Sequence, residues 1–431
     1  MFKTVRGMRD LLPVDAELMR RVEQVSRIVS KLYGYEEIIT PVLESYDLLA
    51  AKTSEEIRER MYTFKDLGDR KVAMRPEFTA SVARLVASKL RNEPKPMRLF
   101  STGSLYRYDE PQYGRFREFW QSNYELFGSP RPEADAEILM LTNDLLKRLG
   151  LKNYRFKVGH TGILREILNQ EGMDEAKQNS VRQLLDKKSW EEALAIARGS
   201  DVSQKCLAAL ERLFETRGED AFKVLETVKE TVQGYDSAVA ATENLWEILR
   251  LVKDSGVKLE VTVEAGFARG LEYYTGMIFE SYVPGIDIAL GGGGRYDKLI
   301  QLFGGEPIPA VGVAQGIDRI VLALKKQKVD PKKTFEKKSV VVISVKDESM
   351  GKALELSDTL RKSGLAVEVA VMGRSVSRAL ADANRRGVAY AVIVGPKELE
   401  EKKVVLKDMN KGEQQTVPIN NLTEAISAGL K

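Results

Sequence analysis

Four consecutive glycines, Gly291–Gly294, limit how this chain can fold more than any other feature. They follow an apolar segment, residues 286–290, which is expected to form a strand, and they lead directly into Arg295-Tyr296-Asp297. Glycine lacks a side chain to pack, so glycines in or beside a strand often mark a place where a ligand or another backbone comes close. A flexible turn is the alternative interpretation.

A nucleotide site at these glycines would belong to neither common glycine-rich type. No Gly-Lys-Ser/Thr follows the run, as a P-loop requires. Nor are the glycines spaced as G-x-G-x-x-G in a strand–helix turn. Arginines are the natural alternative, because a guanidinium stays charged and holds phosphate oxygens through two hydrogen bonds.

Polar side chains gather in three other segments. Residues 75–79 form a strand end that presents a carboxylate and a hydroxyl, Glu77 and Thr79. Two strands, 97–108 and 117–127, are expected to form a hairpin carrying Arg107, Arg115, Arg117, Gln121 and Glu125. The run 266–276 contains Arg269, Tyr273 and Tyr274.

Convergence of the arginines would create a clamp for a triphosphate. The candidates are Arg107, Arg115, Arg269 and Arg319. Their charge would offset that of the phosphates and of an attacking carboxylate. The structural alternative is cross-strand ion pairs on the hairpin and packing of the paired tyrosines. Arg269 in particular could simply pair with Glu264 or Glu272.

Composition excludes several other classes of protein. The single cysteine, Cys206, allows no internal disulfide, and the single histidine, His160, allows no histidine-rich metal site and is expected to be an ordinary turn residue. No apolar stretch approaches 18 residues, and the first residues lack the apolar run of a signal peptide, so no membrane segment is expected. A cytoplasmic location is the default expectation.

The chain of 431 residues is long enough for two to four domains. An amphipathic helix is expected at 15–33 and another helix at 132–149. Residues 153–255 are mostly helical and polar after one strand, which indicates an inserted module. Strands are expected to resume at 259–263 and 274–282.

A lysine-rich stretch, residues 325–338, is expected to be a solvated linker. Strands and helices then alternate through residue 394, which predicts a small α/β domain with a largely parallel sheet. Residues 337–431 hold 16 Lys and Arg against 12 Asp and Glu, so they carry the whole basic excess of the chain, whose net charge is +4. A basic terminal module is suited to a polyanionic partner.

Taken together, these segments resemble the histidyl-tRNA synthetase family of class II aminoacyl-tRNA synthetases. Residues 100–127 resemble class II motif 2, residues 310–319 resemble motif 3, and residues 35–44 with Pro41 resemble motif 1. The runs 269–274 and 292–297 are similar to two signatures of the histidine-specific branch, and the opening run 6–13 matches as well.

The resemblance implies an α+β fold with a mostly antiparallel catalytic sheet flanked by helices. It places the catalytic domain in residues 1–152 and 256–324, a mostly helical insertion in 153–255, and a linker in 325–338. An α/β anticodon-binding domain would then occupy residues 339–431. The implied assembly is a homodimer.

The resemblance also implies a role for each candidate residue. Arg107 and Arg269 would be catalytic, and Arg107, Arg115 and Arg319 would bind ATP. The histidine-binding residues would be Glu77, Thr79, Gln121, Glu125, Tyr273, Tyr274 and Tyr296. The implied partners are L-histidine, ATP with Mg²⁺, and tRNA(His), without a metal site built from the protein alone.

Three alternatives stay open. A regulatory paralogue of histidine biosynthesis would share the catalytic shape, but such paralogues usually lack the terminal module. A class II synthetase for proline or threonine would not explain the runs 269–274 and 292–297. A nucleic-acid-binding protein without catalysis would leave the set of Glu, Gln and Tyr residues unexplained.

Overall fold

The computed structural model describes residues 2–51, 55–269, 273–286, 288–329 and 339–429. The chain divides into two compact units, Met1–Val329 and Asp330–Lys431. Within the described residues, no helix has the length and apolar character needed to cross a lipid bilayer.

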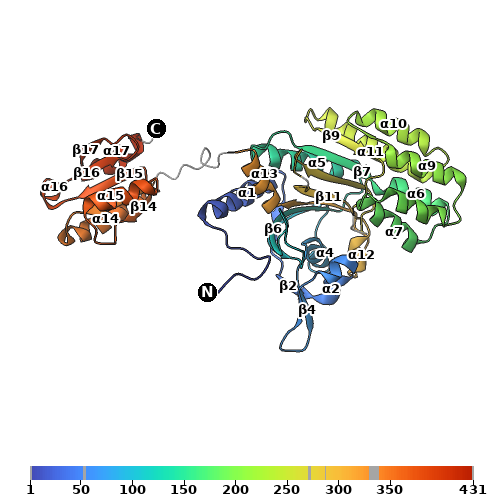
Figure 1. Ribbon diagram of the computed structural model, residues 1–431, viewed down its shortest axis with the longest axis horizontal. Helices are drawn as coiled ribbons and strands as arrows, with labels where there is room; N and C mark the ends of the chain where they lie inside the picture. Colours follow the sequence, from blue (N-terminus) through green and yellow to red (C-terminus); the bar gives the residue numbers. More distant parts are fainter. Residues whose placement is uncertain (1, 52–54, 270–272, 287, 330–338, 430–431) are drawn as a thin grey trace. The chain divides into compact units, whose positions relative to one another are not determined.

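A nine-stranded sheet organises the first unit (Figure 1). Its pairings are antiparallel except for β1 with β5 and β7 with β9. In spatial order the strands are β1 (Glu36–Glu37), β5 (Met97–Tyr106), β6 (Glu118–Phe127), β12 (Ala310–Gly316), β11 (Gly291–Arg295), β10 (Met277–Tyr282), β7 (Arg155–His160), β9 (Val261–Glu264) and β8 (Arg217–Gly218).

Helices cover both faces of this sheet, because its side chains alternate between two buried apolar clusters. One cluster lies under three helices, α1 (Pro13–Leu32), α5 (Pro132–Arg148) and α13 (Ile317–Lys326). The other is covered by α4 (Thr79–Ala87) and α12 (Leu299–Leu302). Tyr124 of β6 belongs to the first cluster and Phe127 to the second, as the period of two in a strand requires.

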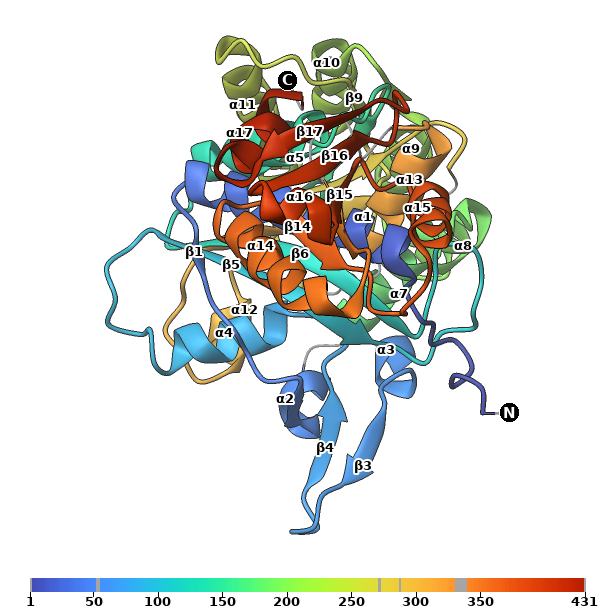
Figure 2. The same cartoon turned by 90° about the vertical axis from the view of Figure 1, so that its left-hand side faces the viewer.

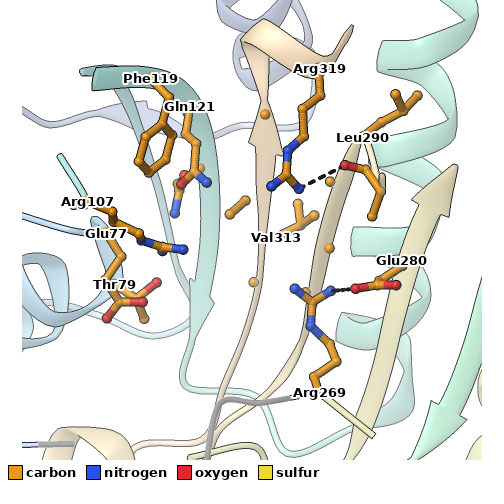
Figure 3. A pocket seen from close by; sticks show the side chains of 18 of the residues that line it. Glu77, Thr79, Arg107, Phe119, Gln121, Arg269, Glu280, Leu290, Val313 and Arg319 are labelled. Atoms are coloured by element: carbon orange, nitrogen blue, oxygen red, sulfur yellow. Dashed lines mark hydrogen bonds and ion pairs between the residues drawn. The ribbon is translucent and has the colours of Figure 1, made fainter. Parts of the chain in front are cut away.

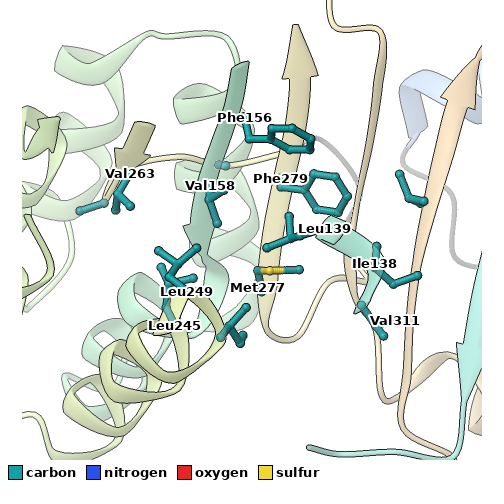
Figure 4. Packing of buried hydrophobic residues seen from close by; sticks show 14 of the residues in the cluster. Ile138, Leu139, Phe156, Val158, Leu245, Leu249, Val263, Met277, Phe279 and Val311 are labelled. Carbon is teal, nitrogen blue, oxygen red and sulfur yellow. The ribbon is translucent and has the colours of Figure 1, made fainter. Parts of the chain in front are cut away.

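Aromatic and branched side chains fill the first cluster (Figure 4). Phe156 of β7 and Phe279 of β10 pack with ring centroids 6.2 Å apart. Leu139 of α5 and Leu249 from the insertion lie against the same strands. Full burial of each such side chain stabilises the fold by roughly 1.5–3 kcal/mol. This packing makes β7 and its neighbours one rigid layer.

Six helices lie between β7 and β9, in the region expected to be an inserted helical module. They are α6 (Thr161–Gln170), α7 (Glu175–Asp186), α8 (Trp190–Arg198), α9 (Gln204–Glu215), α10 (Ala221–Thr231) and α11 (Asp236–Asp254). Helix α11 contacts α5, α6 and β7. The strand that precedes the helices, β7, pairs with β10 in the central sheet.

A smaller three-stranded sheet, in the order β2 (Leu43–Ser45), β4 (Lys71–Met74) and β3 (Thr63–Lys65), belongs to the same unit. Two short helices, α2 (Tyr46–Ala50) and α3 (Glu55–Glu59), precede its β3–β4 hairpin. Figures 1 and 2 show this hairpin extending away from the nine-stranded sheet.

The second unit is an α/β domain with a five-stranded sheet. The strand order is β14 (Ala366–Val369), β13 (Ser339–Ser344), β15 (Tyr390–Val394), β16 (Lys403–Asp408) and β17 (Gln414–Pro418). Its helices are α14 (Met350–Lys362), α15 (Val376–Arg385), α16 (Pro396–Glu400) and α17 (Leu422–Gly429). Only the pairings of β13 with β14 and with β15 are parallel, so the expectation of a largely parallel sheet holds for half of it.

The expected position of one strand of the nine-stranded sheet was also wrong. A strand was expected at 286–290, but the described residues of that segment are not in a strand, and the strand β11 is the glycine run itself with Arg295. Its glycines pair with β10 and β12 on either side. Glycine is a poor strand former in isolation, so the neighbouring strands, rather than local propensity, hold this segment extended.

Candidate active site

A cavity of about 340 Å³ opens on the face of the sheet that carries Gln121 and Glu125, and it unites the separate sequence clusters (Figure 3). Its floor is formed by β6, β11 and β12. Every candidate residue lines it: Glu77, Thr79, Arg107, Arg115, Gln121, Glu125, Arg269, Tyr273, Tyr274, Tyr296 and Arg319.

The glycines of β11 and β12 make room for these side chains. A Cβ on Gly292 would lie 1.6 Å from Nη1 of Arg269, and a Cβ on Gly312 would lie 1.8 Å from Oε2 of Glu125. Atoms cannot approach that closely, so any larger residue would push the guanidinium or the carboxylate aside. The glycine run therefore serves the close approach of site side chains to a strand, one of the two interpretations open from the sequence.

The carboxylate half is our name for the part of the cavity where two buried carboxylates, Glu77 and Glu125, lie among hydroxyl groups. Thr79 Oγ1 donates to Glu125 Oε1 at 2.8 Å, and the Tyr296 hydroxyl donates to Oε2 of the same carboxylate. The Tyr273 hydroxyl donates to Glu77 Oε2 at 3.3 Å. Burial raises the pKa of Glu125 to about 7 and raises the pKa of Glu77 as well. The hydroxyls that donate to these carboxylates are neutral, and the positive charge of Arg107 opposes the rise in the pKa of Glu77.

The phosphate half is our name for the part lined by Arg107, Arg115, Arg269 and Arg319. Backbone carbonyls hold three of these guanidinium groups. Arg107 Nε donates to Pro76 O at 2.9 Å, Arg269 Nη1 to Phe279 O at 2.9 Å, and Arg319 Nη1 to Ala289 O at 3.0 Å. Figure 3 shows Arg319 of α13 and Arg269 of the loop after β9 extending toward the same space.

Burial, with the positive charges of the other three arginines, lowers the pKa of Arg319 to about 10. Mutual repulsion of this kind is relieved when an anion enters. The phosphate half therefore has the electrostatic character of a site for several phosphate groups.

Among the described residues, Arg269 pairs with an acid that the sequence analysis did not consider. Arg269 Nη1 lies 3.4 Å from Glu280 Oε1 on β10. Glu264 instead pairs with Lys157, at 3.4 Å. Glu272, the other acid considered, lies outside the described residues. Glu280 itself lines the cavity, so Arg269 is oriented by an acid of the site.

Several cavity residues escaped the sequence reasoning: Phe119, Asn123, Asp109, Asp186, Glu280 and Asp318. Strand alternation could have found Phe119 and Asn123, because they share a face of β6 with Gln121 and Glu125. The amide of Asn123 donates to the Glu125 carboxylate and opposes the rise of its pKa. No local signal marks Asp186, which reaches the cavity from the end of α7.

His160 ends β7 and caps α6 as a buried residue, where a turn residue was expected. Its Nδ1 accepts a hydrogen bond from Gly162 N at 3.1 Å. Burial lowers the pKa of His160 to about 4, so the imidazole stays neutral near pH 7. Its role is structural.

The fold and the cavity together define a class of protein. A large, mostly antiparallel sheet that carries arginines and carboxylates on one face, followed by a separate α/β unit, is the architecture of a class II aminoacyl-tRNA synthetase.

Comparison with known proteins narrows the class. The family model described as histidyl-tRNA synthetase matches residues 7–320, and the model described as an anticodon binding domain matches residues 339–429. A histidine–tRNA ligase of Methanocaldococcus jannaschii is 42% identical over 425 residues, which cover 98% of this chain and 99% of that protein. The chain belongs to the histidyl-tRNA synthetase family, so the activity that it carries is that of a histidine–tRNA ligase.

Solved structures agree with this fold. A histidyl-tRNA synthetase from Nostoc sp. PCC 7120 superposes with a TM-score of 0.81 at 22% identity, covering 99% of each chain. A protein of Bacillus halodurans C, described as an ATP phosphoribosyltransferase regulatory subunit/histidyl-tRNA synthetase, superposes with a TM-score of 0.76 at 26% identity. The superposition covers 92% of this chain and 98% of that one.

Proposed function

We propose that the cavity joins L-histidine to tRNA(His) in two steps driven by ATP. In the first step the histidine carboxylate attacks the α-phosphorus of ATP, which gives histidyl-adenylate and pyrophosphate. In the second, the terminal adenosine of the tRNA attacks the activated carbonyl and AMP leaves. The observation that carries the proposal is the meeting of a polar, carboxylate-lined half and an arginine-lined half in one cavity.

In this scheme the carboxylate half binds the amino acid, L-histidine. Glu77 and Gln121 hold its α-ammonium group, with Thr79 nearby. Glu125 and Tyr274 face the imidazole, whose N–H needs an acceptor that a carboxylate provides. Tyr273 and Tyr296 line the pocket, and their hydroxyls already orient the two carboxylates.

The phosphate half binds ATP. Arg107 and Arg269 lie at the α-phosphate and the reacting carboxylate, and Arg115 and Arg319 reach the γ-phosphate. The ring of Phe119 lines the cavity and lies 5.4 Å from the Arg107 guanidinium, where it can stack on the adenine base. Catalysis is then mainly positioning and charge neutralisation.

The substrate is expected to enter as the Mg²⁺ complex of ATP, with the ion held largely by phosphate oxygens and water. Among the described residues, no group of three or more His, Cys, Asp or Glu side chains could hold a metal ion. Arg269 supplies positive charge beside the α-phosphate in this scheme. On family grounds we assign the reaction to the cytoplasm.

We propose the domain division expected from the sequence, with residues 1–152 and 256–324 as the catalytic domain. Residues 153–255 are the insertion, 325–338 the linker and 339–431 the anticodon-binding domain. Deleting residues 337–431 should weaken tRNA charging strongly and in a salt-dependent way, because the basic excess lies there. Adenylate formation should survive, since every proposed active-site residue precedes residue 320. Loss of adenylate formation in a folded truncation would contradict this division.

We further propose a homodimer in which residues around Pro41 and helix α1 form the interface. Large apolar side chains are exposed there: Ile28, Leu32, Ile39, Val42 and Leu43. Exposed apolar surface of this kind is typical of a protein–protein contact. A fully active monomer at micromolar concentration, seen by sedimentation, would contradict the dimer.

ATP–pyrophosphate exchange with each of the twenty amino acids tests the proposed function as a whole. Exchange with histidine alone supports it. Exchange with proline or threonine would indicate another class II specificity, and histidine binding without exchange would indicate a regulatory protein.

A further inference from the structure

We propose that the N-terminal strap, residues 5–9, positions the ATP-binding arginines, with Arg9 as a positioning residue. The proposal depends on the assignment of Arg115 and Arg319 to ATP under the proposed function. It also gives a role to the opening run of the chain, which the mechanism above leaves unused.

Arg9 joins the two segments that carry these arginines. It forms an ion pair with Asp318, whose side chain is 3% exposed, and its guanidinium carbon lies 3.5 Å from the centre of the Phe116 ring. Phe116 follows Arg115 and Asp318 precedes Arg319 in the sequence. One guanidinium therefore connects the neighbours of Arg115 and Arg319.

The backbone of the strap follows the turn of the hairpin. Gly7 O accepts a hydrogen bond from Arg117 N at 3.0 Å, and Arg6 O accepts one from Arg117 Nη1 at 3.4 Å. Gly7 has φ +83°, and a Cβ at this position would lie 2.6 Å from Cδ of Arg117. A residue with a side chain at position 7 would thus be strained and would push Arg117 away.

The hairpin turn is supported on a second side as well. Gly114 has φ +72° and lies close to two apolar side chains. A Cβ at this position would lie 2.1 Å from Cδ1 of Ile288 and 3.1 Å from Cδ1 of Leu322 in α13. Asp318 Oδ2 also accepts from Trp120 N at 2.6 Å. The strap and α13 together hold the segment that presents Arg115.

Arg9 has an electrostatic effect in addition. Asp318 lines the cavity, so its carboxylate would repel the phosphates of ATP if it stood alone. The ion pair with Arg9 neutralises it, and stacking on Phe116 fixes the direction of the guanidinium. Loss of Arg9 leaves a buried negative charge beside Arg319.

Arg9→Ala in the full chain tests the proposal. The KM for ATP in pyrophosphate exchange should rise roughly 10-fold or more, because one partner of a buried charge pair is lost. The KM for histidine should not change. Adding Asp318→Asn to Arg9→Ala removes the uncompensated charge and should restore part of the ATP affinity. Arg6→Ala is the matched control, because it removes only an exposed ion pair with Glu110 from the same strap, and it should leave the KM for ATP within about twofold.

Four results would overturn the proposal: an unchanged KM for ATP in Arg9→Ala, an equal rise for histidine and ATP, an equal effect of Arg6→Ala, or no recovery in the double variant. Arg9→Lys keeps the charge and loses the stacking, so it provides a second variant if Arg9→Ala does not fold. An intermediate KM for ATP is expected for Arg9→Lys. A KM equal to that of the unchanged chain would overturn the stacking role. Arg319→Ala separates the strap hypothesis from the assignment of Arg115 and Arg319 to ATP. If it raises the KM for ATP while Arg9→Ala does not, only the strap is wrong, whereas no effect in either contradicts the assignment of ATP itself.

Discussion

The two halves of the cavity hold their charged groups in opposite ways. In the carboxylate half, the carboxylates of Glu77 and Glu125 accept hydrogen bonds from the hydroxyls of Thr79, Tyr273 and Tyr296. In the phosphate half, guanidinium groups donate to backbone carbonyls, and Arg269 also faces the carboxylate of Glu280 at 3.4 Å.

Under the proposed function, this difference follows from what each half has to bind. A neutral hydroxyl orients a carboxylate without cancelling its charge, so that the carboxylate remains an acceptor for N–H groups. A carbonyl does the same for an arginine, which remains a donor to phosphate. Strong internal ion pairs would have satisfied both halves in advance and left little to gain from the substrate.

The largest effect is expected in the phosphate half, from Arg269→Lys. Lysine keeps the charge but loses the fork that bonds Phe279 O and faces Glu280. Single-turnover adenylate formation should slow by roughly 10²–10³, the loss typical of removing one preorganised donor. Arg165→Lys is a suitable control, because Arg165 bonds the nearby Thr275 O without lining the cavity. A near-normal rate for Arg269→Lys would make Arg269 a structural residue.

A slightly smaller effect, on the free energy of unfolding, is expected from the raised pKa of Glu125. The folded chain holds this proton up to a pKa of about 7, whereas the ordinary value is 4.5. Folding is therefore favoured by the proton below pH 4.5, and this contribution is lost as the pH rises through 7. It amounts to up to about 3 kcal/mol.

Glu125→Gln removes that titration and keeps the size of the side chain. Urea unfolding at several pH values should show the variant gaining stability relative to the unchanged chain between pH 5 and 7.5. Parallel profiles would show that Glu125 is not desolvated in the way that its burial in the carboxylate half requires.

Glu125→Ala tests whether the two halves of the cavity bind separate substrates. The imidazole N–H would lose its acceptor, at a cost of about 1–3 kcal/mol. The KM for histidine should rise correspondingly and the KM for ATP should change little. Glu264→Ala, which removes a carboxylate paired with Lys157 outside the cavity, serves as the control. Equal losses for both substrates would identify Glu125 as a structural group instead.

The smallest effect is expected from Tyr273→Phe. This change removes one hydroxyl from Glu77, whose hydrogen bond is 3.3 Å long. A net loss of about 1 kcal/mol, or about fivefold in the KM for histidine, is expected for one such bond. If the KM for ATP rises instead, the two halves are not independent.

Local patterns were enough to predict the helix at 15–33, the hairpin strands around 97–127 and the alternating elements after residue 339. Apolar periodicity and the proline and glycine at helix ends act over a few residues, so a single sequence is enough to recognise them. The helix appears as Pro13–Leu32, followed by Gly34 at φ +74°. The α+β class of the fold was expected from the resemblance to a known family and not from these local patterns.

Tertiary structure decided what local patterns could not. The glycine run became a strand because β10 and β12 pair with it, although its composition favours a turn. The contacts of Arg269 with Glu280 and of Arg9 with Asp318 join residues that lie apart in the sequence. The position of Asn123 beside Glu125 depends on which face of the strand is buried. Such contacts are fixed only when the strands have a register and the helices a packing partner, because distance in space is set by the whole sheet and not by neighbouring residues.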